Sequence, residues 1–162
     1  MYTEAFMQRA LALSAQALDQ PGTEPFGAVI VKDGQVVGEG FNHARAKWDP
    51  TAHGEVEAIR DACQRLGTLQ LDGCELYTSC EPCALCVCAM GIVGISALYY
   101  GASLEQSHAA IGALPASARP PIDTDALRRE AGATIEARRM PATQALDAEA
   151  IDILKQWAAR RS

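Results

Sequence analysis

The chain has 162 residues, of which 49% are hydrophobic and 21% are charged, and its formal net charge at pH 7 is −6. This length suits one globular domain over residues 1–162 that buries a core without disulfide or metal staples. The acidic balance weighs against a protein that grips a long phosphate backbone, so we expect no nucleic-acid partner.

The first predicted element is an amphipathic helix over residues 4–19. Glu4 and Arg9 interrupt its apolar pattern, so this stretch does not resemble a signal peptide, and no stretch approaches the length of a membrane span. We therefore expect a cytoplasmic protein, in which cysteines indicate metal binding or catalysis more often than disulfides. The apolar stripe of this helix comprises Phe6, Met7, Ala10, Leu11, Ala17 and Leu18.

Two β-branched runs follow, and we predict antiparallel strands at 27–32 and 35–41 joined by a tight turn at Asp33-Gly34. A helix is predicted from His53 to the stop signal at Gly67, with Val56, Ile59, Cys63 and Leu66 at helical spacing.

The sequence CELYTS then indicates a strand that leads into Cys80, and Pro82 is placed as the first residue of a buried helix over 82–93. ISALYYG indicates a further strand. The long connection at 102–122 is typical of a lid or a flexible segment.

A helix at 124–131, a strand at 133–137 and a closing helix at 144–161 complete the predicted order. We expect an α/β fold, a three-layer α/β/α sandwich around a five-stranded mixed sheet. The motif-bearing core would end at about residue 101, and residues 102–162 would supply a C-terminal lid, strand and helices.

The sequence SCEPCALCVC concentrates four cysteines at the start of the helix predicted over 82–93. Cys83 and Cys86 are three residues apart, so both thiols lie on one face near the positive end of the helix dipole. Cys80 precedes the helix and Cys88 points to another face, so neither fits the same tetrahedron. We interpret Cys63 and Cys74 as small core residues.

Two cysteines do not complete a zinc site, and His53 and Glu55 lie together at the start of the other central helix. A zinc ribbon would need a second CxxC pair, and a redox CxxC pair would explain neither His53 nor Glu55. Three protein ligands leave one tetrahedral position for water, which is typical of a catalytic zinc. A closed structural zinc module and a thiol oxidoreductase remain the alternatives from other classes.

The motifs HGE at 53–55 and PCALC at 82–86 resemble those of the cytidine and deoxycytidylate deaminase superfamily. PFGAVIVKDG, DPTAH and YTSCEPC resemble its guanine deaminase branch, and tRNA adenosine deaminases share much of this set. The resemblance implies a cytidine deaminase-like fold and one Zn²⁺ per subunit. It further implies a homodimer, in which the tail ILKQWAARRS could reach a neighbouring site.

The resemblance implies that His53, Cys83 and Cys86 bind zinc and that Glu55 transfers protons. It also implies that Asn42 hydrogen-bonds the substrate ring and that Phe26 lines the base pocket.

The chain departs from this family in two places. Gly54 stands where alanine is familiar, which lowers helix propensity by up to about 1 kcal/mol or widens the floor beside the metal. The segment SLEQSHAAIGALP lacks the acidic residues expected after the last shared strand, so Glu105 or His108 could substitute for them, or the substrate differs.

We expect hydrolytic deamination of an amino-bearing nucleobase, most simply of guanine to xanthine and ammonia. The alternatives are a related heterocycle such as ammeline, cytosine or a nucleoside, and tRNA adenosine. The acidic net charge weighs against tRNA.

Overall fold

The structure is a computed structural model that describes residues 1–161. It divides into two compact units, Met1–Arg128 and a second unit that begins at Arg129. That residues 1–162 form one deaminase domain therefore remains a prediction. The first unit contains, in order, α1 (Glu4–Ala15), η1 (Gln16–Leu18), β1 (Glu24–Lys32), β2 (Gln35–Asn42), α2 (Ala44–Lys47), α3 (Gly54–Leu66), β3 (Glu75–Cys80), α4 (Ala84–Val93), β4 (Ala97–Ala102) and α5 (Leu104–Ile111).

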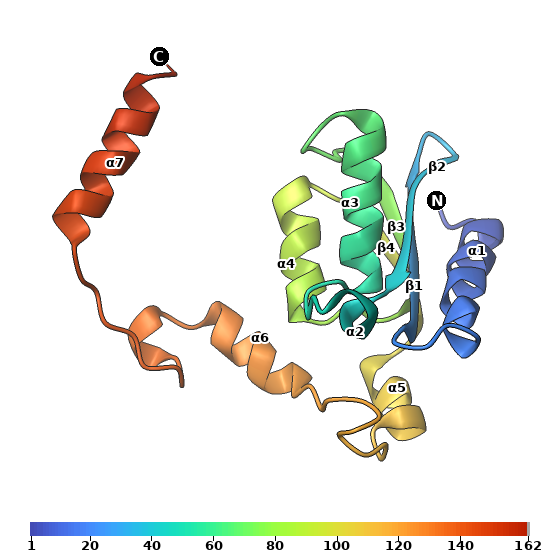
Figure 1. The fold of residues 1–162 in the computed structure, drawn as a ribbon. Coiled ribbons are helices and arrows are strands. Elements are labelled where there is room, and N and C mark those ends of the chain that lie inside the picture. The colour runs from blue at the N-terminus through green and yellow to red at the C-terminus, as the bar shows by residue number, and fades with distance from the viewer. Residues whose placement is uncertain (162) are drawn as a thin grey trace. The chain divides into compact units, whose positions relative to one another are not determined.

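The sheet has the strand order β2-β1-β3-β4. β1 is antiparallel to both β2 and β3, whereas β3 and β4 are parallel and are connected through α4. α1 covers one face of the sheet, and α3 and α4 cover the other (Figure 1). The predicted three-layer α/β/α sandwich with a mixed sheet is confirmed, but the sheet has four strands, not five.

The missing fifth strand is the one predicted at 133–137. That segment contains the short 3₁₀-helix η2 (Ile135–Ala137), in which the Ala137 amide donates to the Thr134 carbonyl. The prediction rested on only two β-branched residues, Thr134 and Ile135. Such a short run can satisfy its backbone within one turn and needs no neighbouring strand.

The β1–β2 hairpin forms as predicted because Asp33 and Gly34 supply the two positive φ angles of its turn, 50° and 75°. Gly67 ends α3 in the left-handed conformation, with φ 65°. Gly38 and Gly40 of β2 then allow α3 to lie against the strand, because a Cβ on either would come within 2.5 Å of the Ala58 backbone. This close packing fixes where α3 begins relative to the sheet.

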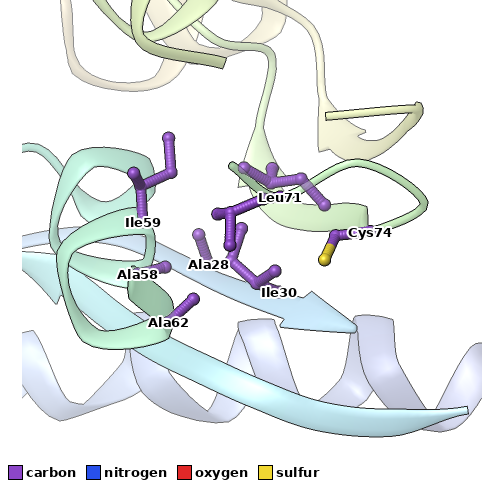
Figure 2. Close-up of a cluster of buried hydrophobic side chains, with 8 residues drawn as sticks. Ala28, Ile30, Ala58, Ile59, Ala62, Leu71 and Cys74 are labelled. Atoms are coloured by element: carbon purple, nitrogen blue, oxygen red, sulfur yellow. The ribbon is translucent and has the colours of Figure 1, made fainter. Parts of the chain in front are cut away.

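Apolar side chains from the sheet, from α3 and from the loop before β3 form the core on the α3 face (Figure 2). Cys74 is fully buried there, in agreement with its predicted core role, whereas Cys63 packs at the edge. The buried members of this cluster are Ala28, Ile30, Ala58, Ile59, Ala62, Leu71, Cys74 and Leu76.

The buried face of α1 differs from the predicted stripe. Met7, Ala10 and Leu13 are buried against the sheet, whereas Leu11 and Leu18 are 49% and 80% exposed. The α-helix ends at Ala15, four residues earlier than predicted, and η1 changes the helical phase. Ala17 and Leu18, which follow this change, therefore do not continue the face formed by the earlier apolar positions.

The prediction of a fully buried helix at 82–93 is wrong in two respects. α4 begins at Ala84, because Cys83 has extended dihedral angles and occupies the N-cap position. One stripe of the helix is also open to solvent, with Val87 53% and Ile92 82% exposed. The sheet and α3 cover only one side of α4. The helix is apolar on every side, so some of its apolar side chains stay exposed.

The connection after β4 contains more helix than predicted, because Ser103 and Gln106 form a reciprocal capping box that starts α5. α6 (Thr124–Gly132) confirms the helix predicted at 124–131. In the second unit, α7 (Asp147–Ala159) confirms the closing helix within three residues at each end. Its apolar residues Ile153, Leu154 and Trp157 are exposed.

Candidate metal and active site

The N-termini of α3 and α4 bring the predicted metal ligands together. His53 is the N-cap residue of α3 and Cys83 that of α4, both with extended dihedral angles, and Cys86 lies in the first turn of α4. Helix N-termini stabilise negative charge, so this position favours thiolates over thiols.

The three side chains have the spacing that tetrahedral zinc requires. His53 Nδ1 lies 3.5 Å from both Cys83 Sγ and Cys86 Sγ, and the two sulfurs are 3.8 Å apart. Zinc bonds of about 2.3 Å to sulfur and about 2.0–2.1 Å to nitrogen place tetrahedral ligands about 3.8 Å (sulfur to sulfur) and about 3.6 Å (sulfur to nitrogen) apart. The residues therefore fit one zinc ion.

The chemistry of the donors agrees with this fit. The hydrogen bond with Cys86, together with neighbouring His53, lowers the pKa of the Cys83 thiol to about 4. The same hydrogen bond and burial raise the pKa of Cys86, and contact with the Cys83 sulfur raises that of His53. Soft sulfur ligands with one imidazole are the donor set typical of zinc.

Glu55 lies beside the cluster without completing it. Its side chain is 5% exposed, with one carboxylate oxygen 3.3 Å from Cys86 Sγ and the other 3.3 Å from Thr78 Oγ1. Burial raises the pKa of this carboxyl, which makes it a better proton acceptor than an exposed glutamate.

A cavity of about 840 Å³ opens beside His53 and Glu55. Asn42, at the end of β2, lines it and is 5% exposed; its Oδ1 accepts the Ala44 amide hydrogen at 2.9 Å, which fixes the orientation of the side-chain amide. Phe26 lines the same cavity. The volume lies within the range of about 300–1,000 Å³ that is typical of small-molecule sites.

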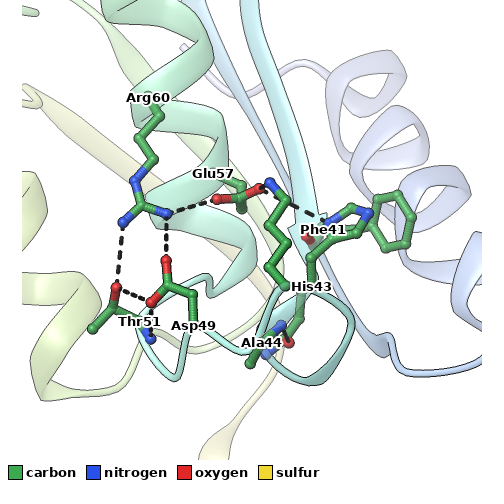
Figure 3. Close-up of polar contacts among 9 residues, drawn as sticks. Phe41, His43, Ala44, Asp49, Thr51, Glu57 and Arg60 are labelled. Carbon is green, nitrogen blue, oxygen red and sulfur yellow. Dashed lines mark hydrogen bonds and ion pairs between the residues drawn. The ribbon is translucent and has the colours of Figure 1, made fainter.

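Charged contacts tie the loop between Asn42 and His53 to α3 (Figure 3). Arg60 donates to Asp49 at 3.2 Å and to Glu57 at 2.8 Å, and Glu57 also pairs with Lys47. Asp49 accepts two hydrogen bonds from Thr51. These contacts hold the loop against the first two turns of α3.

The packing around position 54 explains why it is a glycine. A Cβ at this position would come within 2.2 Å of the Phe26 carbonyl oxygen, so the start of β1 lies directly against the start of α3. The glycine brings the backbone of Phe26 beside the metal ligands, and close backbone approach replaces the predicted loss of helix propensity as the main effect.

The other residues singled out in the sequence differ in whether they reach the cavity. Cys80 is buried and lines the cavity but is not part of the ligand cluster, and Cys88 is exposed. Of the two residues proposed to replace the family's acidic side chain, His108 lines the cavity and Glu105 does not. Sequence reasoning missed Glu24, Glu81 and Arg119, which also line the cavity. Glu24 sits one residue before the PFGAV motif, and Arg119 lies in the long connection at 102–122, where no motif indicates a role for it.

None of the helices within residues 1–161 is long and apolar enough to cross a membrane. The family described as the cytidine and deoxycytidylate deaminase zinc-binding region matches residues 1–102.

Proteins similar to this chain include deaminases from Bacillus subtilis and Aquifex aeolicus. Guanine deaminase from Bacillus subtilis is 49% identical over 102 residues, 63% of this chain and 65% of that protein's length. A tRNA-specific adenosine deaminase from Aquifex aeolicus is 39% identical over 111 residues, 68% of this chain and 72% of that protein. The X-ray structure of guanine deaminase from Bacillus subtilis matches with a TM-score of 0.83 and 37% identity, covering 98% of this chain and 95% of that chain.

Proposed function

The chain belongs to the cytidine and deoxycytidylate deaminase family, and we propose that it is a zinc-dependent aminohydrolase that converts guanine to xanthine and ammonia. The observation that carries the choice of guanine is the match to the Bacillus guanine deaminase structure, which extends over 98% of this chain. That match includes the residues after 102, where the family match ends. The sequence alignment spans 65% of the length of the Bacillus subtilis guanine deaminase.

His53, Cys83 and Cys86 would hold the zinc ion. When bound, zinc lowers the pKa of a water molecule toward neutrality, which provides a nucleophile for the ring carbon that carries the amine. The first turns of α3 and α4 fix the ligands, so the reacting centre would form at the floor of the cavity, next to Glu55.

Glu55 would transfer the protons. Its carboxylate would accept one proton from the attacking water and give it to the ring nitrogen. It would then accept the second proton of that water, now a hydroxyl on the ring carbon, and give it to the amine, so that the carbonyl forms as ammonia leaves. Burial among Thr78, Cys86 and the sheet excludes solvent from the carboxylate and raises its pKa, which suits a group that both accepts and donates.

Asn42 and Phe26 would position the ring. The Asn42 oxygen is held by the Ala44 amide, so the side-chain amide presents a fixed donor and acceptor to a base edge. Phe26 offers an apolar face in the same cavity.

Deamination of tRNA adenosine is the second candidate, because a tRNA-specific relative is 39% identical over 68% of this chain. The net charge of −6 opposes the phosphate contacts on which such a substrate depends. A structural zinc module is less favoured, since it would leave Glu55 buried beside the ligands without a role.

The proposal includes a homodimer and a reducing compartment. α4 exposes an apolar stripe of Val87, Cys88, Gly91 and Ile92, which a second copy could cover. The six cysteines are all free thiols in the structure, which is consistent with a cytoplasmic protein.

Ammonia release by the zinc-loaded protein tests the function. The panel contains guanine, ammeline, cytosine, adenine, their nucleosides and a tRNA anticodon stem, and Glu55→Gln serves as the blank. We expect turnover of guanine and none by the variant, which should keep its zinc. Turnover of the tRNA stem alone would replace the proposal by its second candidate, and activity of Glu55→Gln would contradict the proton-transfer role.

A further inference from the structure

Two charged side chains of the active cavity take no part in zinc binding or proton transfer. Glu24 and Arg119 both line the cavity, although 95 positions separate them in the sequence. Their side chains are only 17% and 25% exposed. Charged groups this far from solvent need partners, and in a ligand cavity the substrate can be one of them.

The sheet places Glu24 next to the side chain proposed to bind the substrate. Glu24 pairs with Asn42 in the antiparallel β1–β2 ladder, and directly opposite residues project from the same face. The next ladder pair is Gly27 with Phe41, so β1 bulges at residues 25–26. Bulges often redirect side chains beside active sites. The Glu24 carboxylate and the Asn42 amide therefore enter the cavity as neighbours.

Arg119 reaches this position from the segment after α5. Its Nε donates to Glu24 Oε2 at 2.9 Å, and its guanidinium carbon lies 5.3 Å from the centre of the Phe26 ring. Arg45 donates to the carbonyl of Ala118, which fastens the same segment to the rim.

Glu24 and Arg119 retain unused hydrogen-bonding capacity. Within residues 1–161, no hydrogen bond or ion pair engages Glu24 Oε1 or the two terminal nitrogens of Arg119. The pair therefore offers the cavity one acceptor and adjacent donors in a fixed arrangement.

No other acidic side chain of the cavity offers the same acceptor. Glu55 is assigned to proton transfer, and Glu81 already accepts the Leu104 amide hydrogen and pairs with Arg128. Glu105, at the start of α5, does not line the cavity. Glu24 is thus the carboxylate left to meet a donor on the substrate.

We propose that Glu24 and Arg119 are specificity-determining residues that read a lactam edge, an adjacent ring N–H and C=O, on an amino-bearing heterocycle. The inference rests on the proposed function and narrows its substrate class. In guanine the N1–H lies beside the carbon that carries the amine, and O6 follows it. The carboxylate accepts from N1–H and the guanidinium donates to O6.

This recognition discriminates against other bases. Adenine and cytosine present an unprotonated ring nitrogen beside the amine-bearing carbon, so its lone pair would face the carboxylate. 2-Aminopurine carries the amine of guanine but lacks both the N–H and the carbonyl. Sites built to hydrogen-bond a substrate group reject analogues that lack it.

Binding measurements separate this inference from the proposed function. Dissociation constants for guanine and 2-aminopurine are measured by calorimetry on the zinc-loaded Glu55→Gln protein, with and without Glu24→Gln, and with Glu105→Gln as the matched control. We expect Glu24→Gln to weaken guanine binding about tenfold or more, as for loss of a charged hydrogen bond, and to change 2-aminopurine binding less than about threefold. Glu105→Gln should change neither.

Equal weakening of both ligands would show that Glu24 only supports the cavity, and no change would show that it does not contact the lactam; either result overturns the inference. Arg119→Met, with zinc content as the test of folding, must cause the same loss of preference even if Glu24→Gln folds poorly. Absence of guanine turnover by the wild-type protein, with the binding preference intact, would instead contradict the proposed function alone.

Discussion

The absence of a side chain at Gly54 lets β1 lie close to α3 beside the site. A Cβ there would come within 2.2 Å of the Phe26 carbonyl oxygen, and that neighbour is backbone, so the strand itself must move. We expect Gly54→Ala to destabilise the protein by about 1–3 kcal/mol through overpacking, more than the gain in helix propensity of up to about 1 kcal/mol. The KM for the substrate should also rise, because Phe26 lines the cavity.

Thermal unfolding and steady-state kinetics measure both effects. Gly132→Ala is the control, since it also adds a methyl group to a helix and its Cβ would have no atom within 4 Å. A Gly54→Ala protein as stable as wild type, with unchanged KM, would show that the strand shifts at no cost.

The four clustered cysteines differ in what they contact, and zinc content should follow that difference. Cys83 and Cys86 lie 3.5 Å from His53 Nδ1, whereas Cys80 is outside the cluster and Cys88 is exposed. We expect Cys83→Ala and Cys86→Ala to lose most bound metal and the other two variants to retain about one zinc per chain. Metal analysis of the purified variants gives the answer, and equal loss in all four would identify a different ligand set.

At the scale of elements, one ion pair joins α1 to β2. Arg9 Nε and Nη2 each donate to a Glu39 carboxylate oxygen at 2.7 Å, and this hydrogen bonding lowers the pKa of Glu39. Because the folded pKa lies below the unfolded value of about 4.3, the pair stabilises the protein above that pH. The contribution is lost as the pH falls through the folded pKa.

Glu39→Gln should therefore lower the free energy of unfolding at pH 7 by up to about 1 kcal/mol, since the pair is partly exposed. The difference from wild type should shrink below about pH 4 as the wild-type carboxylate becomes protonated. Melting temperatures measured across this range test the sign, with the exposed Asp19→Asn as control. A difference that grows on acidification would contradict it.

Elements were predictable where their signals are local. The hairpin turn follows from Asp33-Gly34, and the end of α3 from Gly67, because each needs only its own dihedral angles. Burial could not be predicted from local sequence. α4 is apolar on every side, and the elements packed around it decide which of its side chains are covered. The strand predicted at 133–137 failed for the same reason, since a strand needs a neighbour that the sequence pattern does not name.

On the scale of the whole molecule, the candidate site also contains residues that local sequence signals predict and residues that they do not. His53, Glu55, Cys83 and Cys86 belong to two short motifs at helix starts, so spacing and chemistry were enough to predict them. Glu24 meets Arg119 across 95 positions, and no local pattern indicates that contact. The motif residues could be read from the sequence, whereas the pair that we propose to select the substrate became visible only in the tertiary structure.

The exposed stripe of α4 carries the last prediction, which concerns assembly. Val87, Cys88, Gly91 and Ile92 recur at helical spacing and remain open to solvent, although the helix is apolar on every side. Covering them with a second copy would remove this patch from water, and each fully buried large side chain would contribute about 1.5–3 kcal/mol. A charge in that interface would be desolvated without a partner.

We expect the wild-type protein to form a dimer and Ile92→Glu to be a monomer with unchanged zinc content, as measured by size-exclusion chromatography with light scattering and by metal analysis. Leu69→Glu is the matched control, because Leu69 is also 82% exposed but lies in the loop before β3. The control should remain dimeric. A monomeric wild-type protein, or a dimer that survives Ile92→Glu, would assign this stripe to something other than self-association.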